Sequence, residues 1–153
     1  MTTTYAEKLE QGLLFQDFVV ETLAHTLGLV ISPFCSRANQ IGKGESVQGI
    51  EIKLDKRMRE TGNLYIETEE KSDAANTSFV PSGIYRKDNS WLFLIGDRST
   101  LFVFSTKYLR MLHDTGKYVP KEISTSRGFL FPLPDADKWC LKRIDIEKVE
   151  VAE

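Results

Sequence analysis

Charged and apolar side chains alternate through the segment 49–55, which reads Gly-Ile-Glu-Ile-Lys-Leu-Asp. An extended strand sends successive side chains to opposite faces. The apolar side chains therefore face one side, and the other side carries Glu51, Lys53 and Asp55. A carboxylate and an ammonium on one face could hold a metal ion and stabilise negative charge on a reacting phosphate. Solvated surfaces are also rich in Glu and Lys, so the pattern alone leaves both interpretations open.

Further carboxylates flank this segment. Glu45 precedes Glu51 within a glycine-containing stretch, and the next strand-like run, 63–71, carries Glu67 and Glu69 on a single face. Mg²⁺ prefers oxygen ligands and usually keeps several waters, so two carboxylates and a backbone carbonyl are enough to hold it. We expect a metal between Glu45 and Glu51 to activate a water for attack on a phosphodiester, with Lys53 orienting or deprotonating that water.

The run Gly49-Ile-Glu-Ile-Lys53 resembles the GvEvK strand of the PD-(D/E)xK nucleases, which include restriction enzymes, mismatch-repair nicking enzymes and junction resolvases. A longer and more specific similarity spans residues 49–84, where EIKLD is followed by TGNLYIE and PSGI. This order resembles the EVKxD, TGNxxIE and PSGI pattern of small phage and mobile-element members of the superfamily.

The resemblance implies a role for each matching position. Glu51 would be a metal ligand, Lys53 the catalytic lysine, and the Ile52 carbonyl a further metal ligand. Glu45 would be the leading acid of the motif, although the family usually has Asp there, preceded by Pro. Glu67 would be a supporting or second-metal carboxylate on the neighbouring strand.

A second register of the motif stays open. Asp55 could be the leading acid, with Glu69-Glu-Lys71 as the strand that carries the lysine. We favour the first register because Glu51 and Lys53 follow a glycine and lie within a cleaner apolar alternation. In both registers the site is expected on the same pair of strands.

Hydrophobic periodicity predicts the elements that must position these residues. Residues 6–29 show helical spacing, and the resemblance makes Asp17 or Glu21 of this helix a candidate helical carboxylate. Residues 36–48 read as a loop or weak strand. Residues 49–55 and 63–71 are expected to form an antiparallel pair. The remaining expectations are a turn or short helix at 81–83, buried strands at 91–95 and 101–104 joined by a hairpin, a helix at 106–114, and a helix or strand at 139–149.

Length and composition indicate a single domain spanning residues 1–153. The expected fold class is α/β, with a mixed central β-sheet flanked by helices as in restriction endonucleases and the N-terminal helix packed on one face. The first residues lack the basic start and apolar run of a signal peptide, and no stretch is long enough to span a membrane. We therefore expect a cytoplasmic protein without a membrane partner.

The cysteines and histidines favour no other metal chemistry. Cys35 and Cys140 form no CxxC or CxxH pattern, so we expect buried free thiols. His25 and His113 stand alone, which argues against a zinc or catalytic role. Aromatic pairs at 91/93 and 102/104 read as core. A downstream basic scatter reads as a solvated face that could also touch phosphates: Lys107, Arg110, Lys117, Lys121 and Arg127.

These observations lead to one main functional hypothesis and two alternatives. The chain is expected to be a Mg²⁺- or Mn²⁺-dependent endodeoxyribonuclease that hydrolyses DNA phosphodiester bonds, with homodimerisation open. The formal net charge of −2 argues against a nucleic-acid partner, although a local basic face could still bind phosphates. The alternatives are a catalytically degenerate nuclease fold that binds nucleic acid or protein, and an interaction module of a mobile element.

Overall fold

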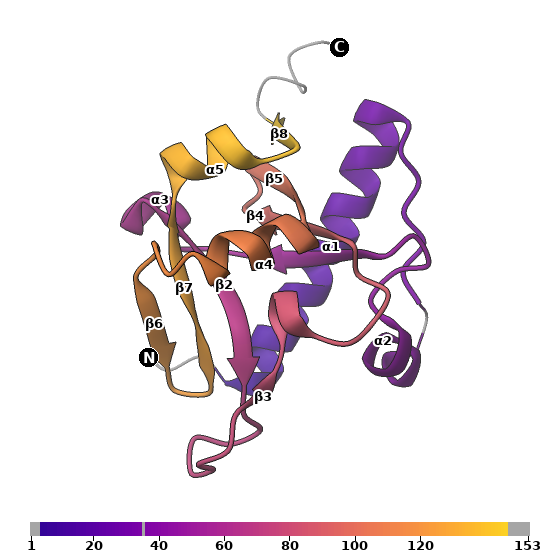
Figure 1. The fold of residues 1–153 in the computed structure, drawn as a ribbon. Helices are drawn as coiled ribbons and strands as arrows, with labels where there is room; N and C mark the ends of the chain where they lie inside the picture. The colour runs from indigo at the N-terminus through magenta and orange to yellow at the C-terminus, as the bar shows by residue number, and fades with distance from the viewer. Residues whose placement is uncertain (1–3, 35, 147–153) are drawn as a thin grey trace.

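The computed structural model describes residues 4–34 and 36–146 and has a mixed α/β architecture built on two four-stranded sheets (Figure 1). The first sheet has the order β1 (Ile50–Leu54), β4 (Leu92–Gly96), β5 (Thr100–Ser105) and β8 (Lys142–Asp145). The second has the order β3 (Val80–Pro81), β2 (Asn63–Glu70), β7 (Ser126–Pro132) and β6 (Pro120–Ile123). The expected single central sheet is therefore divided in two.

Helix α1 (Tyr5–Leu27) covers one face of the first sheet, as expected from its periodicity. Thr4 and Glu7 form a capping box at its start, and Gly28 ends it in the left-handed conformation. Its buried residues Phe15 and Val19 belong to one apolar cluster with Ile50 and Ile52 of β1. The apolar side of β1 thus lies under α1, and its charged side must face away from this helix.

The expected hairpin of buried strands is confirmed, and it forms the centre of the first sheet. Strands β4 and β5 pair in antiparallel fashion, with Phe93 opposite Phe104. Strand β1 runs parallel to β4, with Glu51 opposite Phe93. Because β1 is the last strand on its side of the sheet, the N–H and C=O groups that do not point at β4 are free of ladder bonds.

The expected antiparallel pairing of β1 with β2 is wrong. The connection contains the short helix α3 (Met58–Thr61), which buries Met58 in the core and ends at Gly62 in the left-handed conformation. After this turn β2 pairs with β7 and with β3, in the second sheet. Asp55 still links the two segments, since its carboxylate accepts a hydrogen bond from the Tyr65 backbone N–H at 2.9 Å.

Aromatic and aliphatic side chains fill the space between the two sheets. Leu64 and Ile66 of β2 are fully buried in one cluster with Phe104 of β5 and Phe131 of β7. The rings of Phe104 and Phe131 meet edge to face, with centroids 5.6 Å apart, and so join the two sheets directly. Helix α4 (Thr106–Asp114), which matches its predicted bounds, adds Leu109 to this cluster.

Local sequence misled in several other segments. The stretch expected as a loop or weak strand contains helix α2 (Arg37–Lys43), which Ser36 caps by accepting a hydrogen bond from Asn39 N–H. Helix α5 (Leu133–Trp139) was not expected. It starts beside Pro132 and Pro134, because proline suits the first turn of a helix. Strands β6 and β7 were not expected. Two other expectations are confirmed. The helix or strand expected at 139–149 contains β8, although residues 147–149 lie outside the described residues, and the short helix expected to start at 81–83 is the 3₁₀ helix η1 (Gly83–Tyr85).

Three smaller expectations also have an outcome. Trp91 is 62% exposed, so it is not core as expected, whereas Phe93, Phe102 and Phe104 are buried. Cys140 is a free thiol and is only partly buried, and Cys35 lies outside the described residues. Within residues 4–34 and 36–146, no helix combines the length and apolar character needed to cross a membrane.

The contact between Phe104 and Phe131 predicts a large stability effect. Phe131→Ala should lower the free energy of unfolding by about 3–5 kcal/mol, because it empties a fully buried site that joins the sheets. Val119→Ala is the matched control, since Val119 is 64% exposed and its truncation should cost less than about 0.5 kcal/mol. Urea unfolding of both variants measures the difference, and equal stabilities would contradict this account of the core.

Candidate functional site

The structure brings Glu45, Glu51 and Lys53 together at the outer edge of β1. Lys53 Nζ lies 3.0 Å from Glu51 Oε1 and 4.0 Å from Glu45 Oε1. The loop before β1 returns Glu45 to the strand, where its Oε2 accepts a hydrogen bond from Ile52 N–H at 2.8 Å. The favoured register of the motif is thus assembled around one edge strand.

This loop depends on a close approach that glycine allows. Gly49 has a φ of 76°, a left-handed conformation, and a side chain there would lie 2.6 Å from Cδ1 of the Trp91 ring. Asn89 Nδ2 donates to the Ser46 carbonyl at 2.8 Å, and Trp91 Nε1 donates to the Gln48 carbonyl at 2.7 Å. The segment 86–91 therefore holds the Glu45 loop in place, which explains why the exposed Trp91 is fixed there.

The Ile52 carbonyl also faces the open edge of the sheet. The N–H and C=O of one strand residue point to the same side of the strand. Since the Ile52 N–H points at Glu45 rather than at β4, the Ile52 C=O points away from β4 as well. The three ligand positions implied by the resemblance, Glu45, Glu51 and the Ile52 carbonyl, therefore belong to one corner of the molecule.

Glu51 is the most unusual group of the site. Its side chain is only 1% exposed, and neither carboxylate oxygen accepts a well-aligned hydrogen bond from the described residues. Burial raises the pKa of Glu51 above its ordinary value of 4.5, and the negative charges of Glu45 and Asp88 add to this rise, while Lys53 opposes it. A buried carboxylate with one imperfect cationic partner is costly, which is typical of a site that serves another purpose than stability.

Lys53 is a firmly held positive charge. Its side chain is 38% exposed. Burial by itself would lower the pKa of Lys53, but the carboxylates of Glu51, Glu45 and Glu67 outweigh burial and raise it above the ordinary value of 10.5. Lys53 is therefore held as an ammonium beside these carboxylates.

Glu67 approaches the same site from β2 and is held by two hydroxyl groups. Ser82 Oγ donates to Glu67 Oε1 at 2.7 Å, and Ser126 Oγ donates to Glu67 Oε2 at 2.9 Å. Ser126 in turn shares a hydrogen bond of 2.7 Å with the Tyr65 hydroxyl. Gly83 brings Ser82 close, because a side chain at Gly83 would collide with the Glu67 backbone carbonyl. The carboxylate of Glu67 is therefore fixed in orientation.

Sequence reasoning missed three residues of this site: Asp88, Ser82 and Ser126. The Asp88 side chain is 1% exposed, lies 3.2 Å from Arg86 Nε, and adds its negative charge to the surroundings of Glu51. The PSGI similarity includes Ser82 and could have signalled it, whereas Asp88 follows in a polar turn with no motif. Ser126 had no signal, because the strand that carries it was not expected.

The alternative register is not assembled. The Asp55 carboxylate accepts backbone hydrogen bonds from Arg57 and Tyr65 and so closes a turn. Glu69 lies 3.5 Å from Arg127, and Lys71 Nζ donates to the Asn76 carbonyl at 2.8 Å. Each of the three side chains that this register needs is thus engaged elsewhere.

Helix α1 supplies no carboxylate to a buried site. Asp17 and Glu21, the expected helical candidates, are both exposed. Gln16 is the polar residue that α1 buries, beside Phe15 and Val19. Within the described part of the chain, no three Asp, Glu, His or Cys side chains gather closely enough to hold a metal by themselves. Any cation at this corner would accordingly need the Ile52 carbonyl and water in addition to carboxylates.

Comparison of the chain with models of protein families, with curated proteins and with solved structures finds no match. The resemblance to PD-(D/E)xK nucleases therefore depends on the motif residues of the sequence alone.

The burial of Glu51 predicts how stability depends on pH when a chelator keeps metal away. The folded chain holds a proton on Glu51 more tightly than the unfolded chain does, so the free energy of unfolding falls as the pH rises above about 4.5. Glu51→Gln removes this effect, so the variant should be more stable than wild type at pH 7, and the difference should vanish near pH 4.

Thermal unfolding between pH 4 and pH 8 measures this difference, with Glu10→Gln on the exposed side of α1 as the matched control. A wild type that is more stable than Glu51→Gln at pH 7 would mean that attraction to Lys53 outweighs the burial of the carboxylate.

Proposed function

We propose that this chain is a metal-dependent nuclease that hydrolyses DNA phosphodiester bonds, with a restriction-endonuclease-like fold. The observation that carries the proposal is the buried Glu51 carboxylate, which lies beside Lys53 and near Glu45 and accepts no well-aligned hydrogen bond from any described residue. Buried acceptors without donors are rare and call for an explanation, and a bound cation is one of the few that fits a carboxylate.

The residues present suit a hard divalent cation such as Mg²⁺ or Mn²⁺. Glu45, Glu51 and the Ile52 carbonyl offer only oxygen atoms, which these ions prefer, and leave positions for water and for substrate oxygens. When bound, such an ion supplies an activated water and neutralises charge on the phosphate.

The remaining groups of the site position and stabilise the reacting phosphodiester. Hydrolysis forms a bond between a water oxygen and phosphorus and breaks the bond between phosphorus and the leaving sugar oxygen. One proton of the water goes to that sugar oxygen, and the other goes to the new phosphate monoester or to solvent. Lys53 would place its fixed positive charge beside the phosphate, where negative charge develops. Glu67, oriented by Ser82 and Ser126, would orient water or Lys53 from the side of β2.

A second function is favoured by one specific observation. Lys53 already acts as counter-ion to Glu51 and lies near Glu45, so the corner can balance its charges without a metal. A nuclease fold that has lost catalysis and binds nucleic acid would have this appearance. Binding without cleavage would distinguish it from the enzyme.

Cleavage of DNA tests the proposed function directly. Supercoiled, linear and branched DNA are offered with Mg²⁺ or Mn²⁺, and at least one of them should be cut. Lys53→Ala should lower the rate by at least about a hundredfold, because it removes the cation beside the phosphate. Lys71→Ala is the matched control and should cut at the wild-type rate, since Lys71 donates to a loop carbonyl away from the site. Equal loss in both variants, or no cutting of any substrate by wild type, would count against the proposal.

Metal binding can be measured without cleavage. At pH 7, Mg²⁺ or Mn²⁺ should stabilise wild type, by about 2.7 kcal/mol at a hundredfold excess over the dissociation constant. Glu51→Gln should show little of this stabilisation, because it loses a charged ligand, whereas Glu69→Gln should keep it. A stabilisation that is the same in both variants would locate the cation elsewhere.

A further inference from the structure

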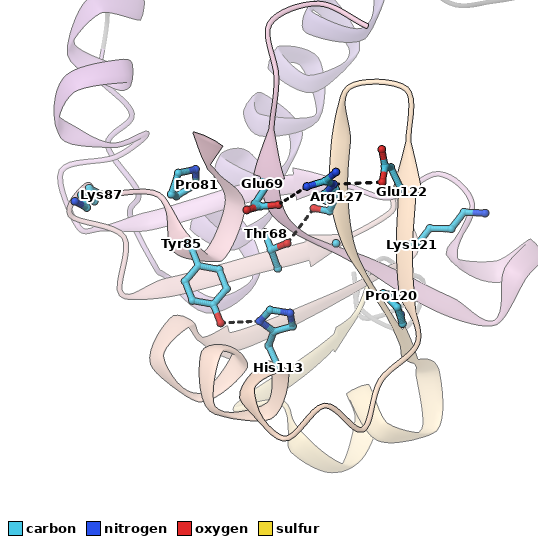
Figure 2. A pocket seen from close by; sticks show the side chains of 11 residues that line it. Thr68, Glu69, Pro81, Tyr85, Lys87, His113, Pro120, Lys121, Glu122 and Arg127 are labelled. Carbon is cyan, nitrogen blue, oxygen red and sulfur yellow. Dashed lines mark hydrogen bonds and ion pairs between the residues drawn. The ribbon is translucent and has the colours of Figure 1, made fainter. Parts of the chain in front are cut away.

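A hollow of about 880 Å³ lies on the second sheet, on the side where α4 and η1 approach it (Figure 2). Its walls combine flat or aromatic groups with a few polar ones: Thr68, Pro81, Tyr85, His113, Pro120 and Gly128. We call it the Tyr85–His113 hollow. Its volume falls within the range of about 300–1,000 Å³ that is typical of sites for small ligands.

Residues that line the Tyr85–His113 hollow are chain neighbours of Glu67 and of the two serines that hold it. Thr68 follows Glu67 on β2, and the ladder between β2 and β7 is irregular between Glu67 and Glu69. Bulges of this kind redirect side chains near functional sites. Pro81 and Arg127 are likewise direct neighbours of Ser82 and Ser126, the two residues that hold Glu67. A ligand in the hollow would thus lie beside the backbone that orients Glu67.

The rings of Tyr85 and His113, which line the hollow, are held in a fixed arrangement. The Tyr85 hydroxyl lies 2.7 Å from His113 Nδ1, and the two rings meet at an angle of 66° (Figure 2). The imidazole stacks on Phe129 with ring planes only 11° apart, which fixes its orientation. Because Nδ1 is engaged by Tyr85, Nε2 is the ring nitrogen left to hydrogen-bond a ligand. Rings and proline faces with one such polar group suit a planar heterocycle.

The charges at the rim favour a ligand joined to phosphates. Arg127 is paired with Glu69 at 3.5 Å and with Glu122 at 3.2 Å, so its charge is already balanced. Lys87 and Lys121 form no ion pair with any described residue, and they lie at opposite sides of the hollow (Figure 2). A nucleic-acid strand crossing the hollow would find a cation on each side and a slot for a base between them.

We propose that the Tyr85–His113 hollow holds the base of an unpaired nucleotide in the DNA substrate. The proposal rests on the proposed nuclease function and narrows its substrate to DNA with an unpaired or displaced base. Stacking tolerates any base, so the hollow selects for an unpaired structure and not for sequence.

Binding in the presence of a chelator tests this without cleavage. The probes are a fully paired duplex and the same duplex with one unpaired 2-aminopurine, whose emission reports stacking. Wild type should bind the second probe about tenfold more tightly, with a change in emission. His113→Ala and Tyr85→Ala should each lose this preference and the change in emission. Tyr85→Phe, which keeps the ring, should retain both and serves as the variant that preserves packing.

The rim lysines are tested by the salt dependence of binding. Lys87→Ala and Lys121→Ala should each lower the slope of log affinity against log salt concentration by about 0.7–0.9. Lys142→Ala on β8, which lies outside the hollow, is the matched control and should leave the slope unchanged. Equal slopes in all three variants would overturn the proposed path of the strand.

Two outcomes separate this inference from the proposed function. Lys53→Ala should keep the preference for the unpaired base while losing cleavage, which would support both. Cleavage by wild type with equal binding of both probes and unchanged emission would overturn the inference and leave the nuclease standing. Selective binding of the unpaired base by a wild type that never cleaves would support the hollow and overturn the nuclease.

Discussion

The buried Glu51 carboxylate and its partner Lys53 place the strongest constraint on this structure. Both side chains leave the same face of β1, and that face is turned away from α1. Burial penalises the Glu51 carboxylate so strongly that its pKa rises even with an ammonium 3.0 Å away. Such a pair can persist only if the surrounding packing is strong, and the continuous apolar cores on either side of the first sheet provide that packing.

Because β1 is an edge strand, only one of its sides is paired with a neighbouring strand, and the backbone groups on its other side can contact side chains or ligands. On one side β4 occupies the ladder positions, which fixes the register of Glu51 and Lys53. On the other side the Ile52 N–H is taken by Glu45, which also blocks that part of the edge from pairing with another strand. The backbone and two carboxylates therefore converge on one corner, while Glu67 arrives from the second sheet.

The sequence predicts those features of the fold whose pattern lies within one short segment, and it does not predict contacts between distant segments. Alternation identified β1, strand-like composition identified β2, and near-continuous apolar runs identified β4 and β5. Periodicity identified α1 and α4. All of these are properties of short segments. The pairing of β1 with β4 and of β2 with β7 joins residues far apart in the chain, so proximity in sequence suggested the wrong partner for β1. The proximity of Glu45, Glu51 and Lys53 could be predicted because their signal lies within one loop and strand. Ser126 and Asp88 were missed because only the fold brings them near.

A net charge of −2 argues against a nucleic-acid partner, but the local distribution of charge matters more than the total. Several carboxylates do not act on the surroundings as free charges, because Glu51 and Asp88 are buried beside Lys53 and Arg86, and Arg127 balances one of the two charges of Glu69 and Glu122. The field that a phosphate meets depends on exposed, unbalanced groups and is screened over about 10 Å at ordinary salt. A chain that hides or pairs its acids near a site can therefore present cations locally while its total charge stays slightly negative.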